Sequence, residues 1–286
     1  MKKLEIKASA KINFGLNIVA RRNDGYHDIE TVFYPVNLFD ILTFTPADKF
    51  SFSCSNQEVH NASNNSVVKA VNLLEDLCSK KLDVKIELEK NIPIGAGMGG
   101  GSSDGATTLL ALNELFNLCV DKTKLSELAL QIGSDVPFFI QPVPSFATSR
   151  GEKLLPVKFE IPYPVLIINP GIHISTKWAY ENIIPQKPDV NLFEVLNKDK
   201  IDFASLKNLI TNDFEQVVFP QYREIRELKD GLYKSGALFS LMTGSGSTVF
   251  GIFENTKTAK KAKLNIPPEY FSFIHEELVY YAIIIF

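Results

Sequence analysis

A glycine-rich run is the segment of this sequence whose residue types most directly suggest a chemical task. It spans residues 92–103, reads IPIGAGMGGGSS, and holds five glycines in the seven positions that start at Gly95. Glycine loses more conformational freedom on folding than any other residue, so such a run is typical of backbone with unusual dihedral angles or a close approach to a ligand. The run therefore indicates a loop that binds a ligand through its main chain.

A helix is predicted directly after this run, from Ser103 to Leu118. Its apolar residues leave almost no polar face, which is typical of a helix buried in the centre of a domain. The free N–H groups and the positive dipole end of that helix would point into the glycine run, which predicts a phosphate site. Ser102 and Ser103 add hydroxyl donors, and either can cap the helix.

Other interpretations of the run stay open. A flexible loop whose serines only cap the helix is the plainest alternative. Residues 95–100 also match the Gly-x-Gly-x-x-Gly pattern of dinucleotide-dependent oxidoreductases. That fold needs a second parallel strand that ends in an acid about 20 residues on, whereas Glu114 lies inside the predicted helix. No lysine follows the glycines in the order of the Gly-x-x-x-x-Gly-Lys phosphate loop, so a loop of that type is excluded.

Two ionisable side chains stand in surroundings where charge is unusual. Lys11 lies in the small and apolar run Ala8–Asn13, and Asp135 lies between a predicted helix end and the apolar run 136–139. We expect Asp135 to be largely desolvated, and a desolvated carboxylate needs a cationic partner. The ordinary alternatives are a lysine on an edge strand and a turn in which Asp135 binds local N–H groups.

Two turns complete the set of candidate segments. Residues 24–27 read DGYH and place an aromatic ring beside an imidazole, although such a sequence is more often an ordinary turn. Residues 242–248 read MTGSGST and join two predicted strands. This second glycine loop is either a tight hairpin or a second wall around phosphate groups.

Together these segments resemble the motifs of the kinase family named after galactose, homoserine, mevalonate and phosphomevalonate kinases (GHMP kinases). The lysine-containing strand, the glycine run and the later glycine–serine loop occur in the family's order, and the likeness extends from Lys7 to Phe253. The lysine strand, residues 21–27 and residues 133–139 are similar to one member, which acts on a cytidine diphosphate-linked alcohol in the non-mevalonate isoprenoid pathway. The resemblance implies an ATP-dependent kinase with Mg²⁺ and an alcohol acceptor.

The resemblance also implies a role for each matched residue. Lys11 and Asp135 would form the catalytic pair, while the residues that hold Mg²⁺ stay unassigned. Asn13 would lie near the acceptor alcohol, Tyr26 would stack on the cytosine, and His27 would hydrogen-bond its edge. The ATP site would consist of Asn65 in the adenosine pocket and of Pro93, Gly95, Gly97, Gly99, Gly100, Gly101, Ser102 and Ser103 along the glycine run.

The elements that must position these residues predict an α+β protein of two domains. Residues 1–160 would form the ATP- and substrate-binding domain, which the resemblance likens to the second domain of ribosomal protein S5. Residues 161–286 would place helices on one face of a mostly antiparallel sheet, and the active site would lie in the cleft between the domains. The predicted strands of the first domain are Leu4–Ala8, Ile12–Val19, Thr31–Val36, Ile41–Phe44 and Val84–Leu88, and its other helices are Ser66–Leu77 and Lys124–Ile132.

The second domain is predicted to follow a β-α-α-β-β-α order. Its predicted elements are the strands Val165–Asn169, Phe239–Thr243 and Thr248–Phe253 and the helices Thr176–Ile183, Tyr222–Lys234 and Thr256–Leu264. The last residues, Tyr280–Phe286, are compatible with a closing edge strand.

Composition limits the partners that the chain could bind. The 286 residues carry a net charge of −3, which opposes an RNA-binding module because no basic field exists to hold a phosphate backbone. No segment approaches the roughly 18 apolar residues of a membrane span, and the N-terminus lacks the apolar stretch of a signal peptide. Three cysteines without a Cys-x-x-Cys pair fit a reducing cytosol. We expect a cytoplasmic monomer or homodimer with a small-molecule substrate.

Overall fold

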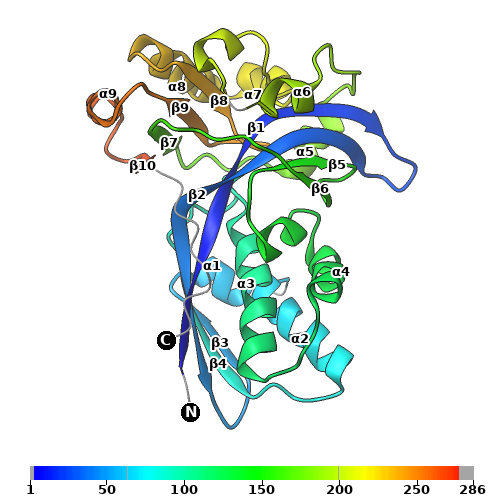
Figure 1. Ribbon diagram of the computed structural model, residues 1–286. Helices are drawn as coiled ribbons and strands as arrows, with labels where there is room; N and C mark the ends of the chain where they lie inside the picture. The colour runs from blue at the N-terminus through cyan, green and yellow to red at the C-terminus, as the bar shows by residue number, and fades with distance from the viewer. Residues whose placement is uncertain (1–2, 63, 199, 277–286) are drawn as a thin grey trace.

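The computed structural model describes residues 3–62, 64–198 and 200–276 and contains two β-sheets with helices packed on them (Figure 1). The larger sheet has six strands and the smaller has four. The sequence segment Tyr280–Phe286, which is compatible with an edge strand, lies outside the described residues. Among the helices of the described residues, none combines the length and the apolar character of a membrane span.

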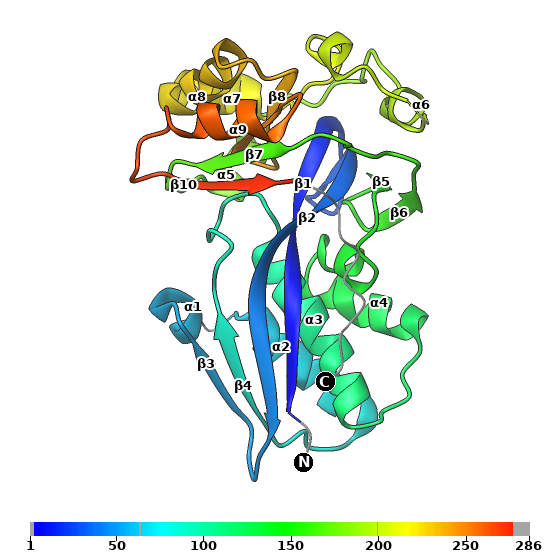
Figure 2. The same cartoon turned by 60° about the vertical axis from the view of Figure 1, so that its left-hand side comes forward.

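The larger sheet has the strand order β3-β4-β2-β5-β6, with β1 paired to β2. The helices α2, α3 and α4 lie together on one side of it (Figure 2), and their apolar residues share one core cluster with the strands. The elements of this part are β1 Leu4–Arg21, β2 His27–Pro46, β3 Ser51–Cys54, α1 Gln57–Asn61, α2 Ser66–Cys78, β4 Val84–Glu89, α3 Gly100–Leu115, α4 Lys122–Ile132, the 3-10 helix η1 Val136–Ile140, β5 Ser145–Thr148 and β6 Lys153–Pro156.

Strands β1 and β2 form one long antiparallel hairpin, whereas the sequence predicted four short strands. The predicted strand ends were wrong because β-bulges interrupt the alternation of apolar and polar residues while the strands continue. The pairing register shifts between Ser9 and Ala10 and again around Gly15, which adopts a φ of +74°. Bulges bend a strand and re-aim its side chains without ending the ladder. The bent hairpin reaches from the larger sheet to the smaller one and carries Lys11 and Asn13 near its middle.

Helix α3 begins at Gly100 and ends at Leu115, three residues earlier at each end than the sequence predicted. Its N-cap is Gly99, which adopts a φ of +73° in the left-handed region that glycine tolerates best. Ser102 and Ser103 therefore lie inside the first turn, and the prediction that either of them caps the helix was wrong. The helix is buried as predicted, with nine of its residues shielded from solvent between Ser103 and Leu112.

The smaller sheet has the order β10-β7-β9-β8 and is antiparallel throughout, as expected. The helices α7, α8 and α9 lie on one side of it (Figure 2), and its other face packs on β1, β2 and α6. The sequence missed the short α6 and α7 and strand β10. The elements are β7 Val165–Asn169, α5 Thr176–Asn182, α6 Leu192–Leu196, the 3-10 helix η2 Phe203–Leu206, α7 Glu215–Gln221, α8 Arg223–Lys234, β8 Phe239–Met242, β9 Val249–Ile252, α9 Thr256–Lys263 and β10 Phe271–His275.

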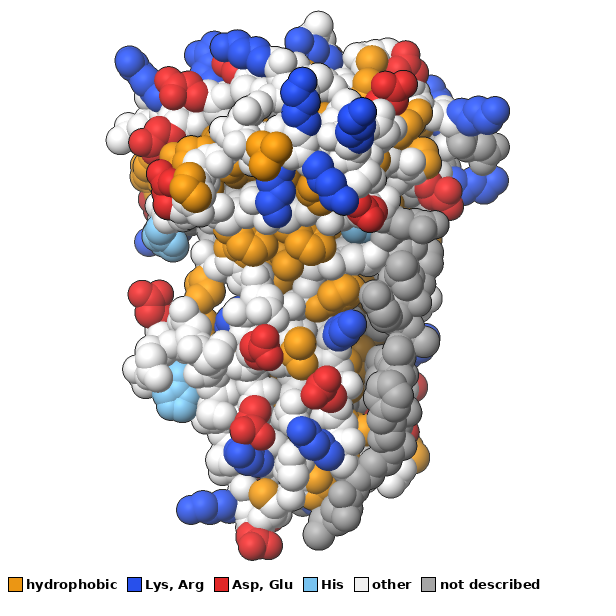
Figure 3. Space-filling model, turned by 90° about the vertical axis from the view of Figure 1, so that its left-hand side faces the viewer, with side chains coloured by type: hydrophobic (Ala, Val, Ile, Leu, Met, Phe, Trp, Pro, Cys, Tyr) orange, Lys and Arg blue, Asp and Glu red, His pale blue; other side chains and the backbone are white. Residues whose placement is uncertain are grey.

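The predicted domain boundary at residue 160 falls in the connection between β6 and β7. It stays a prediction, because one apolar cluster joins both parts of the chain. Phe14 of β1 stacks on Phe239 of β8 with 4.8 Å between ring centroids, and it also contacts Phe159 at 4.7 Å. On the face shown in Figure 3, side chains of both charge signs are interspersed over the two parts.

Candidate active site

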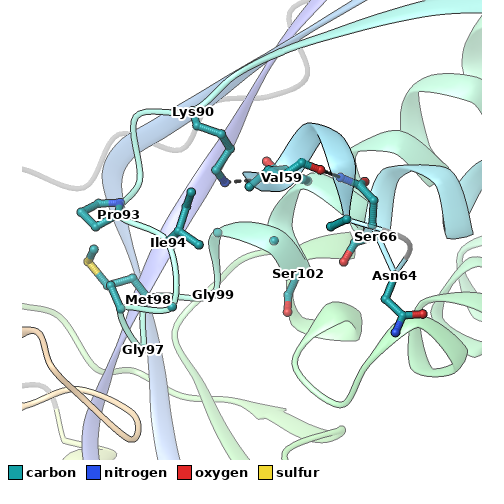
Figure 4. A pocket seen from close by; sticks show the side chains of 17 residues that line it. Val59, Asn64, Ser66, Lys90, Pro93, Ile94, Gly97, Met98, Gly99 and Ser102 are labelled. Atoms are coloured by element: carbon teal, nitrogen blue, oxygen red, sulfur yellow. Dashed lines mark hydrogen bonds and ion pairs between the residues drawn. The ribbon is translucent and has the colours of Figure 1, made fainter. Parts of the chain in front are cut away.

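Two cavities lie on either side of the glycine run. The first, which we call the loop cavity, has a volume of about 370 Å³ and lies between residues 59–62 and 64–66, Lys90 and residues 93–104 (Figure 4). The second, which we call the aromatic cleft, has a volume of about 620 Å³ and includes Lys11, Asn13, Tyr26, His27 and Asp135 among its lining residues. Gly97, Gly99 and Ser102 line both, so ligands in the two cavities would meet at these residues.

The glycine run adopts backbone that other residues rarely adopt. Gly95, Gly97 and Gly99 have φ values of +64°, +75° and +73°. Directly after them, the first N–H groups of α3 border the loop cavity, where no preceding helical carbonyl can satisfy them. Those N–H groups and the positive end of the helix dipole make this end of the cavity suited to an anion such as phosphate.

Several glycines of the run are also required by protein packing. A β-carbon on Gly97 would lie 2.3 Å from the carbonyl oxygen of Thr243, and one on Gly99 would lie 2.8 Å from Cζ of Phe139. On Gly101, by contrast, the nearest atom would be Oγ of Ser66 at 3.9 Å, so this position faces open space. Ala96 and Met98 are buried in the core that the two sheets share. The run is thus anchored at alternate positions, which argues against a loose loop.

Asn65 and Pro93 both line the loop cavity, opposite and within the glycine run. The amide of Asn65 is already used by the chain, because Oδ1 accepts from Val67 N at 2.8 Å and Nδ2 donates to Val59 O at 3.0 Å. Asn65 therefore caps α2 and ties it to α1. Its predicted place in an adenosine pocket fits this location, and the role stays a prediction.

Lys11 and Asp135 come together at the inner end of the aromatic cleft. Nζ of Lys11 lies 3.4 Å from Oδ2 of Asp135 and donates to Asn13 Oδ1 at 2.6 Å and to Gly97 O at 3.1 Å. The Lys11 side chain is 4% exposed, so it is not an edge-strand lysine. Burial lowers the pKa of its ammonium, and the carboxylate of Asp135 partly opposes that shift.

The expectation that Asp135 is largely desolvated was wrong. Its side chain is 35% exposed and opens into the aromatic cleft, while the lysine is the buried partner. The turn alternative is also not supported, because the Asp135 side chain does not cap the 3-10 helix η1 that follows it. A partly exposed carboxylate held beside a buried ammonium can reach a ligand in the cleft.

Main-chain contacts fix this pair relative to both glycine loops. The N–H of Lys11 donates to Met98 O at 2.9 Å, and the N–H of Asn13 donates to Thr243 Oγ1 at 2.8 Å. Nδ2 of Asn13 donates to Thr31 Oγ1 at 3.0 Å. Residues 243–248 connect the antiparallel strands β8 and β9, and Gly244 and Ser245 line the cleft. The second glycine loop is therefore both a hairpin connection and a wall of this cleft.

Tyr26 and His27 lie at the outer end of the aromatic cleft. Tyr26 is 51% exposed, and the guanidinium of Arg150 lies over its ring at 4.5 Å from the centroid. His27 is buried and stacks on Tyr180, with ring centroids 4.9 Å apart and planes at 21°. Burial, assisted by the charge of Arg21, lowers the pKa of His27, so its imidazole is neutral at pH 7. Residues 24–27 therefore form a turn, as the alternative interpretation predicted, and this turn places the rings of Tyr26 and His27 in the cleft.

Sequence reasoning missed Tyr180, Arg150, Thr31, Thr243 and Lys90. Tyr180 lies in α5 and Arg150 in the connection between β5 and β6, and both line the aromatic cleft. The helix that holds Tyr180 was predicted, but nothing in its spacing indicates that this side chain faces His27. Lys90 lines the loop cavity (Figure 4) and could have been noticed as a lysine just ahead of the glycine run.

Comparison with known proteins places this chain in a family. The family model of the GHMP kinases N terminal domain matches residues 65–141, and the model of the GHMP kinases C terminal matches residues 192–272. The 4-diphosphocytidyl-2-C-methyl-D-erythritol kinase of Prosthecochloris aestuarii is 40% identical over 275 residues, which cover 94% of this chain and 96% of the relative. The enzyme of the same name from Azobacteroides pseudotrichonymphae is 44% identical over 86% of this chain and 92% of the relative.

Solved structures show the same relationship. A crystal structure of 4-(cytidine 5'-diphospho)-2C-methyl-D-erythritol kinase superimposes with a TM-score of 0.81 and 32% identity, covering 95% of this chain and 98% of that one. Mevalonate kinase of Methanococcus jannaschii, at 14% identity and a TM-score of 0.73 over 97% of this chain and 99% of that one, shares the fold. The chain therefore belongs to the GHMP kinases, which are ATP-dependent small-molecule kinases, and within them to the 4-diphosphocytidyl-2-C-methyl-D-erythritol kinases.

Proposed function

We propose that this enzyme transfers the γ-phosphoryl group of ATP to the 2-hydroxyl of 4-diphosphocytidyl-2-C-methyl-D-erythritol, in non-mevalonate isoprenoid biosynthesis. The observation that carries the proposal is the aromatic cleft, which holds the Lys11–Asp135 pair at one end and the rings of Tyr26, His27 and Tyr180 at the other. An alcohol at the inner end and a pyrimidine at the outer end would be parts of one ligand. The loop cavity beside it would hold ATP.

Phosphoryl transfer requires positioning and charge neutralisation more than covalent help from the protein. As the acceptor oxygen forms its bond to the γ-phosphorus and the bond to ADP breaks, the hydroxyl proton would pass to the carboxylate of Asp135. The ammonium of Lys11 lies 3.4 Å from that carboxylate. The proton would move late, once bond formation to phosphorus has made the acceptor oxygen more acidic. Lys11 would meanwhile orient Asp135 and neutralise charge on the acceptor oxygen.

The outer end of the cleft suits a cytosine. Tyr26 offers a half-exposed ring on which a base can stack, an interaction worth about 1–3 kcal/mol. Neutral His27 has one N–H donor and one ring-nitrogen acceptor, and its plane is fixed by stacking on Tyr180 at 4.9 Å. A hydrogen bond from a fixed imidazole discriminates between base edges, because a mismatched edge leaves a buried polar group unpaired.

The donor set around the glycine run is compatible with Mg²⁺ delivered on ATP. Among the described residues, no group of three or more His, Cys, Asp or Glu side chains could hold a metal ion by itself. Mg²⁺ is commonly bound by substrate phosphates, waters and only one or two protein groups. Ser102 lines both cavities and would be the hydroxyl closest to ATP phosphates there. When bound, the ion would neutralise phosphate charge.

The proposal also includes the cellular compartment and the oligomeric state of the enzyme. The three cysteines, Cys54, Cys78 and Cys119, are free, which fits the reducing cytoplasm where we expect the enzyme to work. We expect a monomer or homodimer without nucleic-acid or membrane partners.

Turnover of ATP against a panel of alcohols tests the proposal. The panel pairs 2-C-methyl-D-erythritol 4-phosphate with its cytidine diphosphate derivative and adds homoserine and mevalonate. We expect phosphorylation of the cytidine derivative alone, with the new phosphate on the 2-hydroxyl by NMR. Equal turnover of the compound without the cytidine group, or turnover of homoserine, would contradict the assignment and leave an unspecified alcohol kinase.

A further inference from the structure

Three buried charges form a cluster in the wall of the loop cavity. Nζ of Lys90 contacts Oδ2 of Asp40 and lies 2.9 Å from Oδ2 of Asp104. The side chains of Lys90, Asp40 and Asp104 are 6%, 0% and 4% exposed. The residues lie far apart in the chain: Asp40 is in β2, Lys90 directly follows β4, and Asp104 is in α3. Figure 4 shows Lys90 in the wall of the cavity with an ion pair drawn at its ammonium group.

Stability alone does not account for this cluster. Removing ions from water costs several kcal/mol for each, and well-packed apolar residues in place of a buried ion pair are often neutral or stabilising. One carboxylate oxygen, Oδ1 of Asp104, is buried and has no hydrogen-bond partner among the described residues. Burial raises the pKa of Asp104, and the ammonium of Lys90 opposes that shift. Burial alone would lower the pKa of Lys90, but Asp104 and Asp40 raise it, so the ammonium remains charged. A positional function is the better explanation.

The cluster holds both ends of the glycine run. Oδ1 of Asp40 accepts the N–H of Asn91 at 2.6 Å and the N–H of Ile92 at 2.8 Å, directly before Pro93. Asp104 directly follows Ser103 at the other end of the run. One ammonium therefore joins the entry of the loop to its exit through two carboxylates.

Gly100, the first residue of α3, lies close to the ammonium of Lys90. A β-carbon on Gly100 would lie 3.2 Å from Nζ of Lys90 and 3.1 Å from Cγ2 of Ile92. The N–H groups that follow Gly99 are those that face the loop cavity, so a shift of Lys90 would move the groups suited to bind phosphate.

We infer that Lys90, held between Asp40 and Asp104, is a positioning residue for ATP: its ammonium fixes the two ends of the glycine run and thereby the first turn of α3. Lys90 is enclosed by carboxylates and need not touch the nucleotide. The inference rests on the loop cavity as the ATP site and is independent of which alcohol occupies the aromatic cleft.

Nucleotide binding without acceptor, measured by calorimetry with a non-hydrolysable ATP analogue, tests the inference. Lys90→Met removes the charge while keeping an unbranched chain, and we expect Kd to rise by at least about tenfold because a buried carboxylate pair loses its cation. In steady state, KM for ATP should rise while KM for the acceptor stays unchanged. An unchanged Kd, or an equal rise in both KM values, would overturn the inference. The matched control is Lys85→Met on β4, which breaks only the half-exposed pair with Glu87 at 2.8 Å.

Asp104→Asn separates positioning from simple charge repulsion. This variant removes a negative charge next to the triphosphate, so repulsion alone predicts tighter nucleotide binding. Loss of the ionic connection to Lys90 predicts weaker binding, by about threefold or more, because an ionic hydrogen bond is stronger than a neutral one. Tighter or unchanged binding would refute the positioning role. If Lys90→Met fails to fold, this near-isosteric variant carries the test alone.

Discussion

The loop cavity and the aromatic cleft share Gly97, Gly99 and Ser102 but are built in different ways. The loop cavity is formed mostly by one stretch of main chain, residues 93–104, which faces residues 59–62 and 64–66. The aromatic cleft is formed mostly by side chains from β1, the β1–β2 turn, β2, the residues just before η1, the β5–β6 turn, α5 and the residue just before α7. Phosphate can be held by N–H groups that are neighbours in the chain, whereas an alcohol and a base need side chains placed from several directions.

The largest expected effect is on the chemistry at the inner end of the cleft. Asp135→Asn keeps the shape of the side chain but removes the proton acceptor, so kcat should fall by roughly 10²–10⁴-fold. The affinity for ATP should remain similar, because Asp135 lines the cleft and not the loop cavity. Single-turnover rates and calorimetry measure the two quantities. A variant that keeps more than about a tenth of the wild-type kcat would remove Asp135 from the mechanism.

Two glycine substitutions distinguish the wall that both cavities share from the part that lines the loop cavity alone. Gly97→Ala should impair both substrates, because its β-carbon would lie 2.3 Å from Thr243 O at a φ of +75° and the residue lines both cavities. Gly101→Val should weaken ATP by about tenfold or more and leave KM for the acceptor unchanged, because the new side chain would fill the space that the ligand needs. Thermal unfolding serves as the control for folding.

Calorimetry with ATP on both variants decides whether the distinction holds. Normal ATP affinity in Gly101→Val would show that the loop is structural and that the phosphate-site proposal fails. An effect of Gly97→Ala on one substrate alone would show that the two cavities do not share this wall.

A moderate effect is expected at the outer end of the cleft. Tyr26→Ala should raise KM for cytidine and uridine substrates alike, by the about 1–3 kcal/mol of a lost stacking partner. His27→Ala should narrow the preference for cytosine over uracil, because the hydrogen bond that reads the base edge is lost. Neither change should alter ATP binding. Values of kcat/KM for both nucleotides provide the measurement, and an unchanged ratio with unchanged KM would reduce residues 24–27 to a turn.

The smallest expected effect is on the pH dependence of the enzyme in the alkaline range, where activity and the stability contribution of Lys11 should change in opposite directions. Because burial lowers the pKa of Lys11 below its ordinary 10.5, the folded chain binds fewer protons than the unfolded chain between those two values. The contribution of Lys11 to the free energy of unfolding should therefore rise with pH over that interval. Activity, which uses the charged ammonium, should fall over the same interval.

The comparison of wild type with Lys11→Met isolates the contribution of Lys11 to the unfolding free energy from the contributions of the other lysines and the tyrosines, which also titrate at alkaline pH. Urea unfolding across the alkaline range should give a difference in unfolding free energy that increases with pH. A difference that decreases with pH would mean that the pairing with Asp135 outweighs the burial of Lys11.

Local patterns predicted much of the fold. The strand Val165–Asn169 was predicted with its observed bounds, and the buried helix, the antiparallel second sheet and the GHMP kinase fold were confirmed. The errors lie where neighbouring elements decide the outcome. Bulges joined short strands into the β1–β2 hairpin, and Gly99, held in the left-handed region, moved the start of α3 ahead of the serines.

The sequence by itself determined the phosphate site predicted at the glycine run, the family motifs and the candidates Lys11 and Asp135. Each of these was recognised from residues that are neighbours in the chain. Tertiary structure alone decided that Asp135 is the partly exposed partner and Lys11 the buried one. It also decided that Tyr180 stacks on His27, and that Asp40 and Asp104 hold Lys90 beneath the loop. These residues lie tens of positions apart, and their burial and partners depend on how β1, β2, β4, α3 and α5 pack, which no spacing along the chain specifies.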